Sequence, residues 1–260
     1  MPPDGDTLPH PRSRSAPVSV VTAVHDKAIR FLPQAASSLA DQGTHVEWIV
    51  CYDGDRIPGL LAKTMRQCAQ YLPGARLVSA GRKAGPSTAR TIALSHVRTL
   101  WTAALDADDV WLPDGLTRLL DTARATAAPW CAGRTVDLYE DDRQEFPDYL
   151  PTGPQAAGTV FDTYERLGFL PFHGCAVVWA TSVLWRMGGW PALPSSEDTG
   201  LVLAASERFD GFYQGGAAVY GYRKHANQST AEPDYADRQA IAIRHNRKWI
   251  STLRRTTHLV

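Results

Sequence analysis

Long apolar runs, a cysteine framework and an excess of charge of either sign are all missing from this sequence. No window of about 18 residues is continuously apolar, so no segment has the composition of a membrane-spanning helix. With 27 Lys and Arg against 27 Asp and Glu, the formal net charge is +0, which argues against bulk nucleic acid as the partner. Residues 1–16 lack the apolar stretch of a signal peptide, and we expect them to form a disordered tail.

Cysteine is scarce and dispersed. The 4 cysteines are too scattered for a zinc knuckle or a redox pair and too few for a disulfide scaffold: Cys51, Cys68, Cys131 and Cys175. This pattern predicts reduced thiols in a cytoplasmic protein. The composition is that of a chain that can bury a hydrophobic core, since 44% of the 260 residues are hydrophobic and 21% are charged. The length predicts one large domain or two halves that share a sheet.

Short β-branched runs alternate with amphipathic segments through the first half of the chain. The strand-like runs are 18–24, 46–52, 75–79 and 101–105, and helical spacing follows each of them, at 28–39, 61–72, 87–100 and from Pro113 onward. Such alternation favours right-handed crossovers, and so predicts an α/β fold with a Rossmann-like, mostly parallel sheet flanked by helices. Ligands of these sheets bind beyond the carboxyl ends of the strands. Asp26, Asp53 and Asp106 follow three of the runs, and we expect them to converge on one edge.

The most specific local feature is a cluster of carboxylates after the fourth run. Asp106, Asp108 and Asp109 fall within four positions, and such crowding is self-repelling unless a cation is bound. Oxygen ligands at a strand end suit Mg²⁺ or Mn²⁺ bound to a diphosphate. The alternative is structural, with Asp108 and Asp109 capping the next turn and Asp106 solvated.

Three further motifs each have a functional and a structural interpretation. The segment 85–90 opens a helix with small residues and ends in Arg90, so it could bind an anion or be an ordinary helix start. Glu197 and Asp198 precede an apolar helix. The pair could provide a general base, or it could simply cap the N-terminus of that helix. The cluster 220–225 is basic and aromatic, and either closes over a diphosphate or is a solvated loop.

Taken in this order, the motifs resemble glycosyltransferase family 2, the inverting enzymes with the GT-A fold. The resemblance runs from about Val18 to Ser229, with 105–109 similar to the DXD metal motif, Glu197-Asp198 to the Glu-Asp base motif and 222–225 to the closing Tyr-Arg-x-His segment. His25 and Tyr52 depart from residues that are usual near the nucleobase. The departures bear on the identity of the base more than on the fold or chemistry.

The resemblance implies a metal-dependent inverting transfer of a sugar from a nucleoside diphosphate donor, which we expect to be UDP-linked, to a hydroxyl acceptor. Asp198 would be the general base, supported by Glu197, and Asp106, Asp108 and His225 would hold Mg²⁺ or Mn²⁺. If Asp198 were not the base, His173 would be the next candidate. The donor would bind to residues from both strand ends and loops: Ala23, His25, Asp53, Gly85, Arg90, Asp106, Ala107 and Arg223.

The resemblance also divides the chain. Residues 17–130 would bind the nucleotide sugar, 131–229 would bind a small-molecule or glycan acceptor, and 230–260 would be a helical extension. The extension, helical from about 235 to 255, mixes cationic with apolar residues. Packing on its own domain or on the second subunit of a homodimer is the favoured interpretation, and contact with an anionic membrane is the alternative.

Other classes fit part of the pattern. Asp106-Ala107-Asp108-Asp109-Val110 also matches haloacid-dehalogenase-like phosphatases, in which the first Asp would be the nucleophile. That motif normally ends the first strand of its domain, whereas about three strand-helix units precede it here. A sugar nucleotidyltransferase would need a Gly-rich loop after strand one, and 23–28 has no Gly. A non-catalytic sugar-nucleotide binder would need the metal motif but no base.

Overall fold

A large mixed sheet carries the structure. The computed structural model describes residues 17–256, so the predicted tail, 1–16, lies outside the described residues. Strands follow the order β3-β2-β1-β4-β10-β6-β11-β9. Their bounds are β1 Val18–Val24, β2 Val46–Tyr52, β3 Ala75–Ser79, β4 Trp101–Ala104, β6 Trp130–Gly133, β9 Gly153–Gln155, β10 Val177–Ala180 and β11 Gly211–Gln214.

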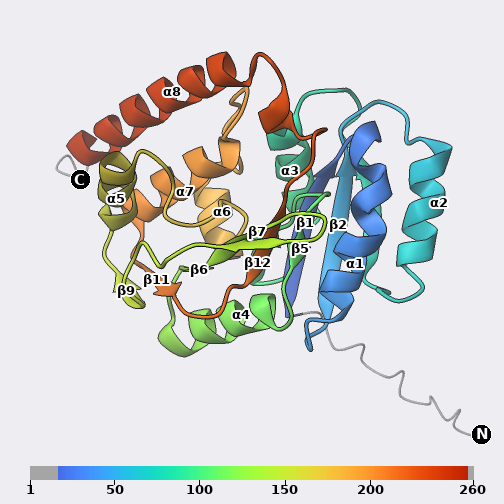
Figure 1. The fold of residues 1–260 in the computed structure, drawn as a ribbon, viewed down its shortest axis with the longest axis horizontal. Coiled ribbons are helices and arrows are strands. Elements are labelled where there is room, and N and C mark those ends of the chain that lie inside the picture. Colours follow the sequence, from blue (N-terminus) through green and yellow to red (C-terminus); the bar gives the residue numbers. More distant parts are fainter. Residues whose placement is uncertain (1–16, 257–260) are drawn as a thin grey trace, which may run out of the picture.

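The N-terminal half of the sheet is parallel. β1 pairs with β2 and β4, and β2 pairs with β3, all in parallel register. Val18, Val20 and Val21 of β1 are fully buried, as expected for a strand covered on both faces. The covering helices include α1 Leu32–Ala40, α2 Gly59–Cys68 and α3 Pro86–Leu94, with the short 3₁₀ helix η1 Asp26–Phe31 before α1. The predicted α/β fold with a mostly parallel sheet is confirmed (Figure 1).

The second half of the chain extends the same sheet. β10 runs antiparallel between β4 and β6, and β11 returns parallel to β6. Helices of this half are α4 Gly115–Thr126, α5 Thr159–Leu167, α6 Thr181–Met187, α7 Glu197–Arg208 and α8 Tyr235–Thr256. Figure 1 shows α8 lying along α7 and α5, at the opposite end of the molecule from α2. No helix among residues 17–256 is long and apolar enough to cross a membrane.

A second, smaller sheet lies beside the first and was not predicted. Its order is β5-β12-β7-β8, with β5 Val110–Trp111, β7 Thr135–Leu138, β8 Arg143–Glu145 and β12 Tyr220–Arg223. β12 is therefore held between the segment that follows the acidic cluster and the segment that follows β6. The short 3₁₀ helix η2 Ser229–Ala231 comes next along the chain.

Several predicted helices have different bounds in the structure. The helix expected over 28–39 is η1 followed by α1, and the one expected over 61–72 is α2, which ends at Cys68. The helix expected over 87–100 ends at Leu94, because the amides of Ser95, His96 and Val97 bond three residues back and turn the chain toward β4. The helix expected from Pro113 begins at Gly115, because Asp114 has a left-handed φ of 56°. None of these changes moves the strand ends that form the site.

Gln42 joins α1 to α4 and is fully buried. Its amide donates to Ser38 O at 2.8 Å and Leu112 O at 3.0 Å, and its carbonyl oxygen accepts from Leu116 N at 2.8 Å. An apolar residue at position 42 would leave these backbone groups without hydrogen-bond partners in a region that is buried from solvent.

We expect Gln42→Leu to lower the free energy of unfolding by about 1–3 kcal/mol, the cost of unsatisfied buried polar groups. Urea unfolding measures it. The matched control is Gln67→Leu on the exposed side of α2, which should change the free energy by less than about 0.5 kcal/mol. Equal effects for both variants would contradict the role given to Gln42.

Candidate active site

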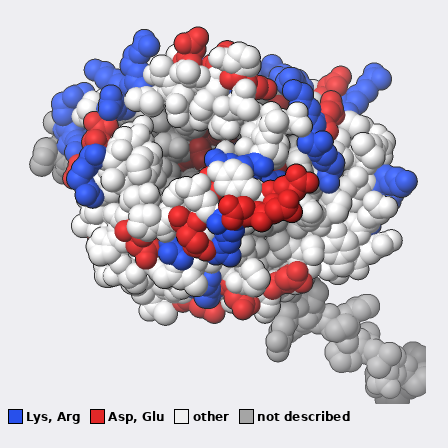
Figure 2. Space-filling model, in the orientation of Figure 1, with Lys and Arg blue, Asp and Glu red and all other residues white. Residues whose placement is uncertain are grey.

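A cavity of about 760 Å³ opens beyond the carboxyl ends of β1, β2 and β4. Figure 2 shows the hollow from outside, with acidic atoms visible in its depth. Most of the predicted site residues line it: Ala23, His25, Asp53, Arg90, Asp106, Ala107, Asp108, Glu197 and Asp198. Gly85, Arg223 and His225 do not line the cavity, but each contacts a residue that does.

Arg90 lies at the centre of the site and is 5% exposed. One terminal nitrogen of its guanidinium pairs with Glu197 at the start of α7, and the other pairs with Asp106 at the end of β4. Burial by itself raises the pKa of Asp106, but the charges of Arg90 and nearby His173 outweigh it and hold that pKa below its usual range. One cation thus joins the two motifs that the sequence separates by about ninety residues.

Asp108 and Asp109 of the acidic cluster contact different parts of the segment 220–225. Asp108 Oδ2 lies 2.9 Å from His225 Nε2, and Asp108 O accepts from Arg223 Nε at 2.7 Å. Asp109 is 1% exposed and accepts from Tyr220 Oη at 3.0 Å and Arg223 N at 2.8 Å. Burial, with Asp106 and Asp108 adding to it, raises the pKa of Asp109 well above its usual range. Asp109 therefore anchors β12 to the end of β4, a role close to the structural alternative.

One of the two carboxylate oxygens of Asp53 is bound by backbone amides. Its Oδ1 accepts from Ala84 N at 2.7 Å and Gly85 N at 3.0 Å, where Gly85 adopts the left-handed φ of 88° that glycine favours. Oδ2 has no hydrogen-bond partner among the described residues and is the oxygen left for a ligand. Asp53 thus both fixes the entry to α3 and keeps one acceptor for the cavity.

Two of the three strand-end acids line the cavity. Asp53 and Asp106 line the cavity, whereas Asp26 Oδ1 accepts a hydrogen bond from Tyr52 Oη at 2.9 Å outside it. Tyr52 is a departure noted in the sequence, and its ring needs the glycine at 54. A Cβ on Gly54 would lie 2.2 Å from the Tyr52 ring.

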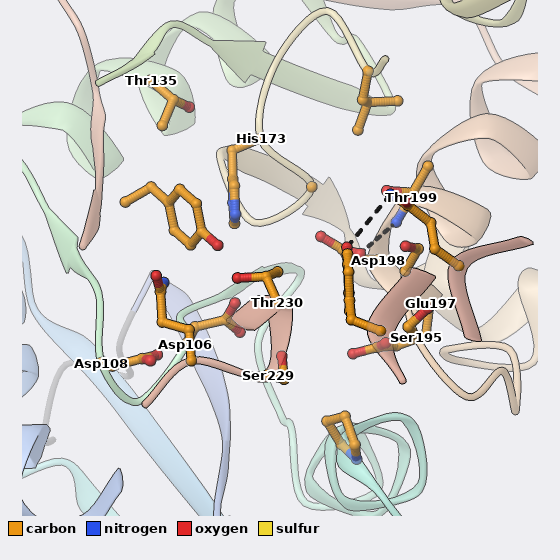
Figure 3. Close-up of a pocket in the computed structure, with 18 of the residues that line it drawn as sticks. Asp106, Asp108, Thr135, His173, Ser195, Glu197, Asp198, Thr199, Ser229 and Thr230 are labelled. Carbon is orange, nitrogen blue, oxygen red and sulfur yellow. Dashed lines mark hydrogen bonds between the residues drawn. The ribbon is translucent and has the colours of Figure 1, made fainter. Parts of the chain in front are cut away.

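Asp198 lies across the cavity from Asp106 and Asp108, in the first turn of α7 (Figure 3). Its Oδ1 accepts from Thr199 N at 2.7 Å. Oδ2 lies against Gly174, where an added Cβ would approach it to 2.2 Å. Only glycine leaves room at position 174 for this carboxylate.

His173 and Cys175 are neighbours of Asp198 that no sequence motif singled out together. The His173 ring stacks on Tyr220 at 5.1 Å between ring centres, and its Nδ1 accepts from Cys175 N at 3.2 Å. Ligand-type atoms of His173, Cys175 and Asp198 lie within 4.8 Å of one another, as do those of Asp106, Asp109 and His173. Sequence reasoning held His173 only in reserve, because the loop after α5 has no recognisable spacing.

The outer part of the cavity is apolar. Phe146, Tyr149 and Phe169 line it, and the rings of Tyr149 and Phe169 meet edge to face at 5.1 Å. These side chains come from 143–172, a stretch that contributes no carboxylate to the cavity.

The donor set of Asp106 and Asp108 fits a hard divalent cation. Arg90 and the Cys175 thiol contact Asp106 Oδ1, and His225 contacts Asp108 Oδ2. The second oxygen of each carboxylate has no hydrogen-bond partner among residues 17–256, and both residues line the cavity. Mg²⁺ and Mn²⁺ use one or two such carboxylates and take their other ligands from water and phosphate.

A mostly parallel sheet with a cavity beyond its strand ends, and carboxylates on its two facing walls, is the architecture of the GT-A fold. The family model described as Glycosyl transferase family 2 matches residues 19–177, and the chain belongs to this family.

One curated protein and two solved structures are similar to this chain. The chain is 34% identical over 113 residues to the succinoglycan biosynthesis protein ExoO of Rhizobium meliloti (strain 1021), a match that covers 43% of the chain and 31% of ExoO. S. aureus TarS 1–349 in complex with UDP-GlcNAc is similar with a TM-score of 0.68 at 14% identity, over 87% of this chain and 65% of that one. Mannosyltransferase PcManGT from Pyrobaculum calidifontis, in complex with GDP-Man and Mn²⁺, gives 0.57 at 16% identity, over 86% and 61%. The chain thus spans about a third of the curated relative and less than two thirds of these structures.

Replacing Arg90 tests how much its two ion pairs contribute to the free energy of unfolding. We expect Arg90→Met to lower the free energy of unfolding near neutral pH by about 3–5 kcal/mol, because two buried carboxylates lose their partner. Arg90 helps to depress the pKa of Asp106, so this stabilisation is present above the unfolded value of about 4 and is lost as the pH falls through the folded-state pKa. Urea unfolding at neutral pH and below about pH 4 should show the loss shrinking in acid.

The control for this variant is Arg66→Met, whose side chain is exposed on α2. It should change the free energy of unfolding by less than about 0.5 kcal/mol at either pH. A loss in Arg90→Met that stays constant with pH would contradict the electrostatic account.

Proposed function

We propose that the protein transfers a glycosyl group from a UDP-linked sugar to a hydroxyl acceptor with inversion at the anomeric carbon, using a divalent metal and Asp198 as general base. The observation that carries this proposal is the bridge through Arg90. It fixes Asp106 on one wall of the cavity and Glu197, next to Asp198, on the other. A displacement reaction needs this arrangement, because the leaving group and the attacking hydroxyl lie on opposite faces of the sugar.

The free oxygen of Asp53 supports a uracil base. Asp53 Oδ1 is already shared by two backbone amides, so Oδ2 alone is available. Uracil offers a single ring N–H at this edge, whereas guanine offers an adjacent pair of N–H groups that favours both oxygens of a carboxylate. Solved relatives bind both kinds of donor, UDP-GlcNAc in TarS and GDP-Man in PcManGT.

Asp106 and Asp108 would hold the metal, with His225 beside Asp108. When bound there, Mg²⁺ or Mn²⁺ would neutralise the charge that develops on the diphosphate as the bond to the sugar breaks. The chain's own residues orient these ligands. Arg90 fixes Asp106, and the contact of Arg223 Nε with Asp108 O fixes the backbone of the turn.

Asp198 would take the proton of the acceptor hydroxyl. It lies in the first turn of α7, the end of the helix where the dipole interacts favourably with a carboxylate. The acceptor oxygen forms its bond to the anomeric carbon, the bond to the diphosphate oxygen breaks, and the proton goes to Asp198. One displacement of this kind inverts the anomeric centre.

The competing classes have less support. A haloacid-dehalogenase-like phosphatase would carry its nucleophilic Asp at the end of the first strand, whereas Asp106 follows β4. The family assignment also favours a transferase. A non-catalytic binder differs from an enzyme in having no use for Asp198, so the variant below separates the two.

We expect Asp198→Asn to lower the turnover of UDP-sugar by about 10²-fold or more, because the amide keeps the shape but cannot accept the proton. Calorimetric affinity for UDP should stay within a few fold. Glu197→Gln should lower turnover less, and Asp141→Asn in an exposed loop should leave it unchanged. A near wild-type rate in Asp198→Asn would move the proton to another group, and a parallel loss of UDP binding would make the residue structural.

Metal dependence gives a second test. UDP should bind more weakly in excess EDTA than with Mn²⁺, and Asp108→Asn should weaken binding by about tenfold or more in Mn²⁺. In EDTA the variant and the wild type should bind alike, since the lost ligand no longer matters. Asp121→Asn, on the exposed side of α4, is the control. Equal wild-type affinity with and without chelator would refute the metal site.

A further inference from the structure

The hydroxyl of Ser195 is buried at the cavity and has no hydrogen-bond partner among the described residues. The residue is 8% exposed and lines the cavity. A buried hydroxyl without a partner costs stability, so folded proteins rarely keep one without a use. The unpaired hydroxyl therefore indicates that a bound ligand supplies its hydrogen-bond partner.

Ser195 is placed by the same turn that places the proposed base. Pro194 precedes it, and Ser196 follows with a left-handed φ of 53°, which is unfavourable for a residue other than glycine. Asp198 comes three residues later. Figure 3 shows Ser195 on the side of the cavity that carries Glu197 and Asp198, across from Asp106 and Asp108.

We infer that Ser195 Oγ donates a hydrogen bond to the attacking oxygen of the acceptor and so positions it for Asp198. This inference rests on the proposed function. A hydroxyl oxygen has two lone pairs, of which one attacks the anomeric carbon and the other accepts from Ser195, while its proton goes to Asp198. Ser195 gains no proton and loses none in this step. Water meets the same requirements, so Ser195 also positions water when no acceptor is present.

The wall that carries Ser195 favours the acceptor over the donor as its ligand. The proposed diphosphate site is on the opposite wall, at Asp106 and Asp108. The attacking oxygen must approach from the side of the base. A hydroxyl three residues from the base is therefore suited to that oxygen.

A buried serine with a different bonding pattern provides the control. Ser87, in the first turn of α3, is 4% exposed, and its hydroxyl donates to Trp190 O at 2.9 Å. Ser87→Ala breaks a hydrogen bond that the free protein makes. Ser195→Ala removes a hydroxyl that the free protein leaves unpaired.

The experiment compares full-length wild type with Ser195→Ala, Ser195→Thr and Ser87→Ala. Thermal unfolding is measured without ligand, calorimetry gives the affinities for UDP, UDP-glucose and UDP-GlcNAc, and UDP release is followed with water as the acceptor. We expect Ser195→Ala to unfold no earlier than wild type and to bind all three nucleotides equally well. Its UDP release should be slower by about threefold to tenfold, the loss of one neutral hydrogen bond. Ser195→Thr should restore most of the rate, and Ser87→Ala should unfold at a lower temperature.

Each contrary result has a distinct meaning. Early unfolding of Ser195→Ala, as in Ser87→Ala, would give the hydroxyl a structural role and overturn the inference. Weaker binding of the UDP-sugars with unchanged UDP affinity would assign the hydroxyl to the donor sugar, which also overturns it. An unchanged rate of UDP release would do the same. Wild-type protein that binds UDP but releases none from either sugar nucleotide would sink the proposed function itself, and this inference with it.

Discussion

The site depends on a single buried cation. Arg90 pairs with Asp106 from the end of β4 and with Glu197 from the start of α7, and these elements belong to different halves of the chain. Neither carboxylate forms another ion pair among residues 17–256, and a buried charge without a partner is costly. The two walls of the cavity therefore keep one separation, and the residues proposed to bind the diphosphate and to remove the proton are held in register.

A second set of contacts works on the other side of the acidic cluster. Asp109 accepts from Tyr220 and from the backbone of Arg223, which brings β12 to the end of β4. The same turn directs Asp108 toward His225. Three acids in one short sequence thus have three partners within the protein, Arg90 for Asp106, His225 for Asp108 and β12 for Asp109.

Much of this arrangement was predictable from the sequence, and its failures have physical causes. The strand-helix alternation is strong because buried parallel strands read as continuous apolar runs, as in 18–24 and 46–52. Spacing places Asp26 just after the first strand, but it does not indicate that Asp26 binds Tyr52 instead of lining the cavity. Contacts between segments that are distant in the sequence form the small sheet, place Cys175 against Asp106 and place the Ser195 hydroxyl at the cavity. The periodicity of apolar residues along the chain does not indicate such contacts.

The outer wall of the cavity is independent of the bridge at its base. Phe146, Tyr149 and Phe169 come from the stretch 143–172, outside the walls joined by Arg90. Substitutions there can reshape the entrance while the spacing between Asp106 and Asp198 is kept by residues that are buried elsewhere. The fold therefore keeps the shape of the cavity entrance separate from the spacing of the carboxylates, so the two can change independently.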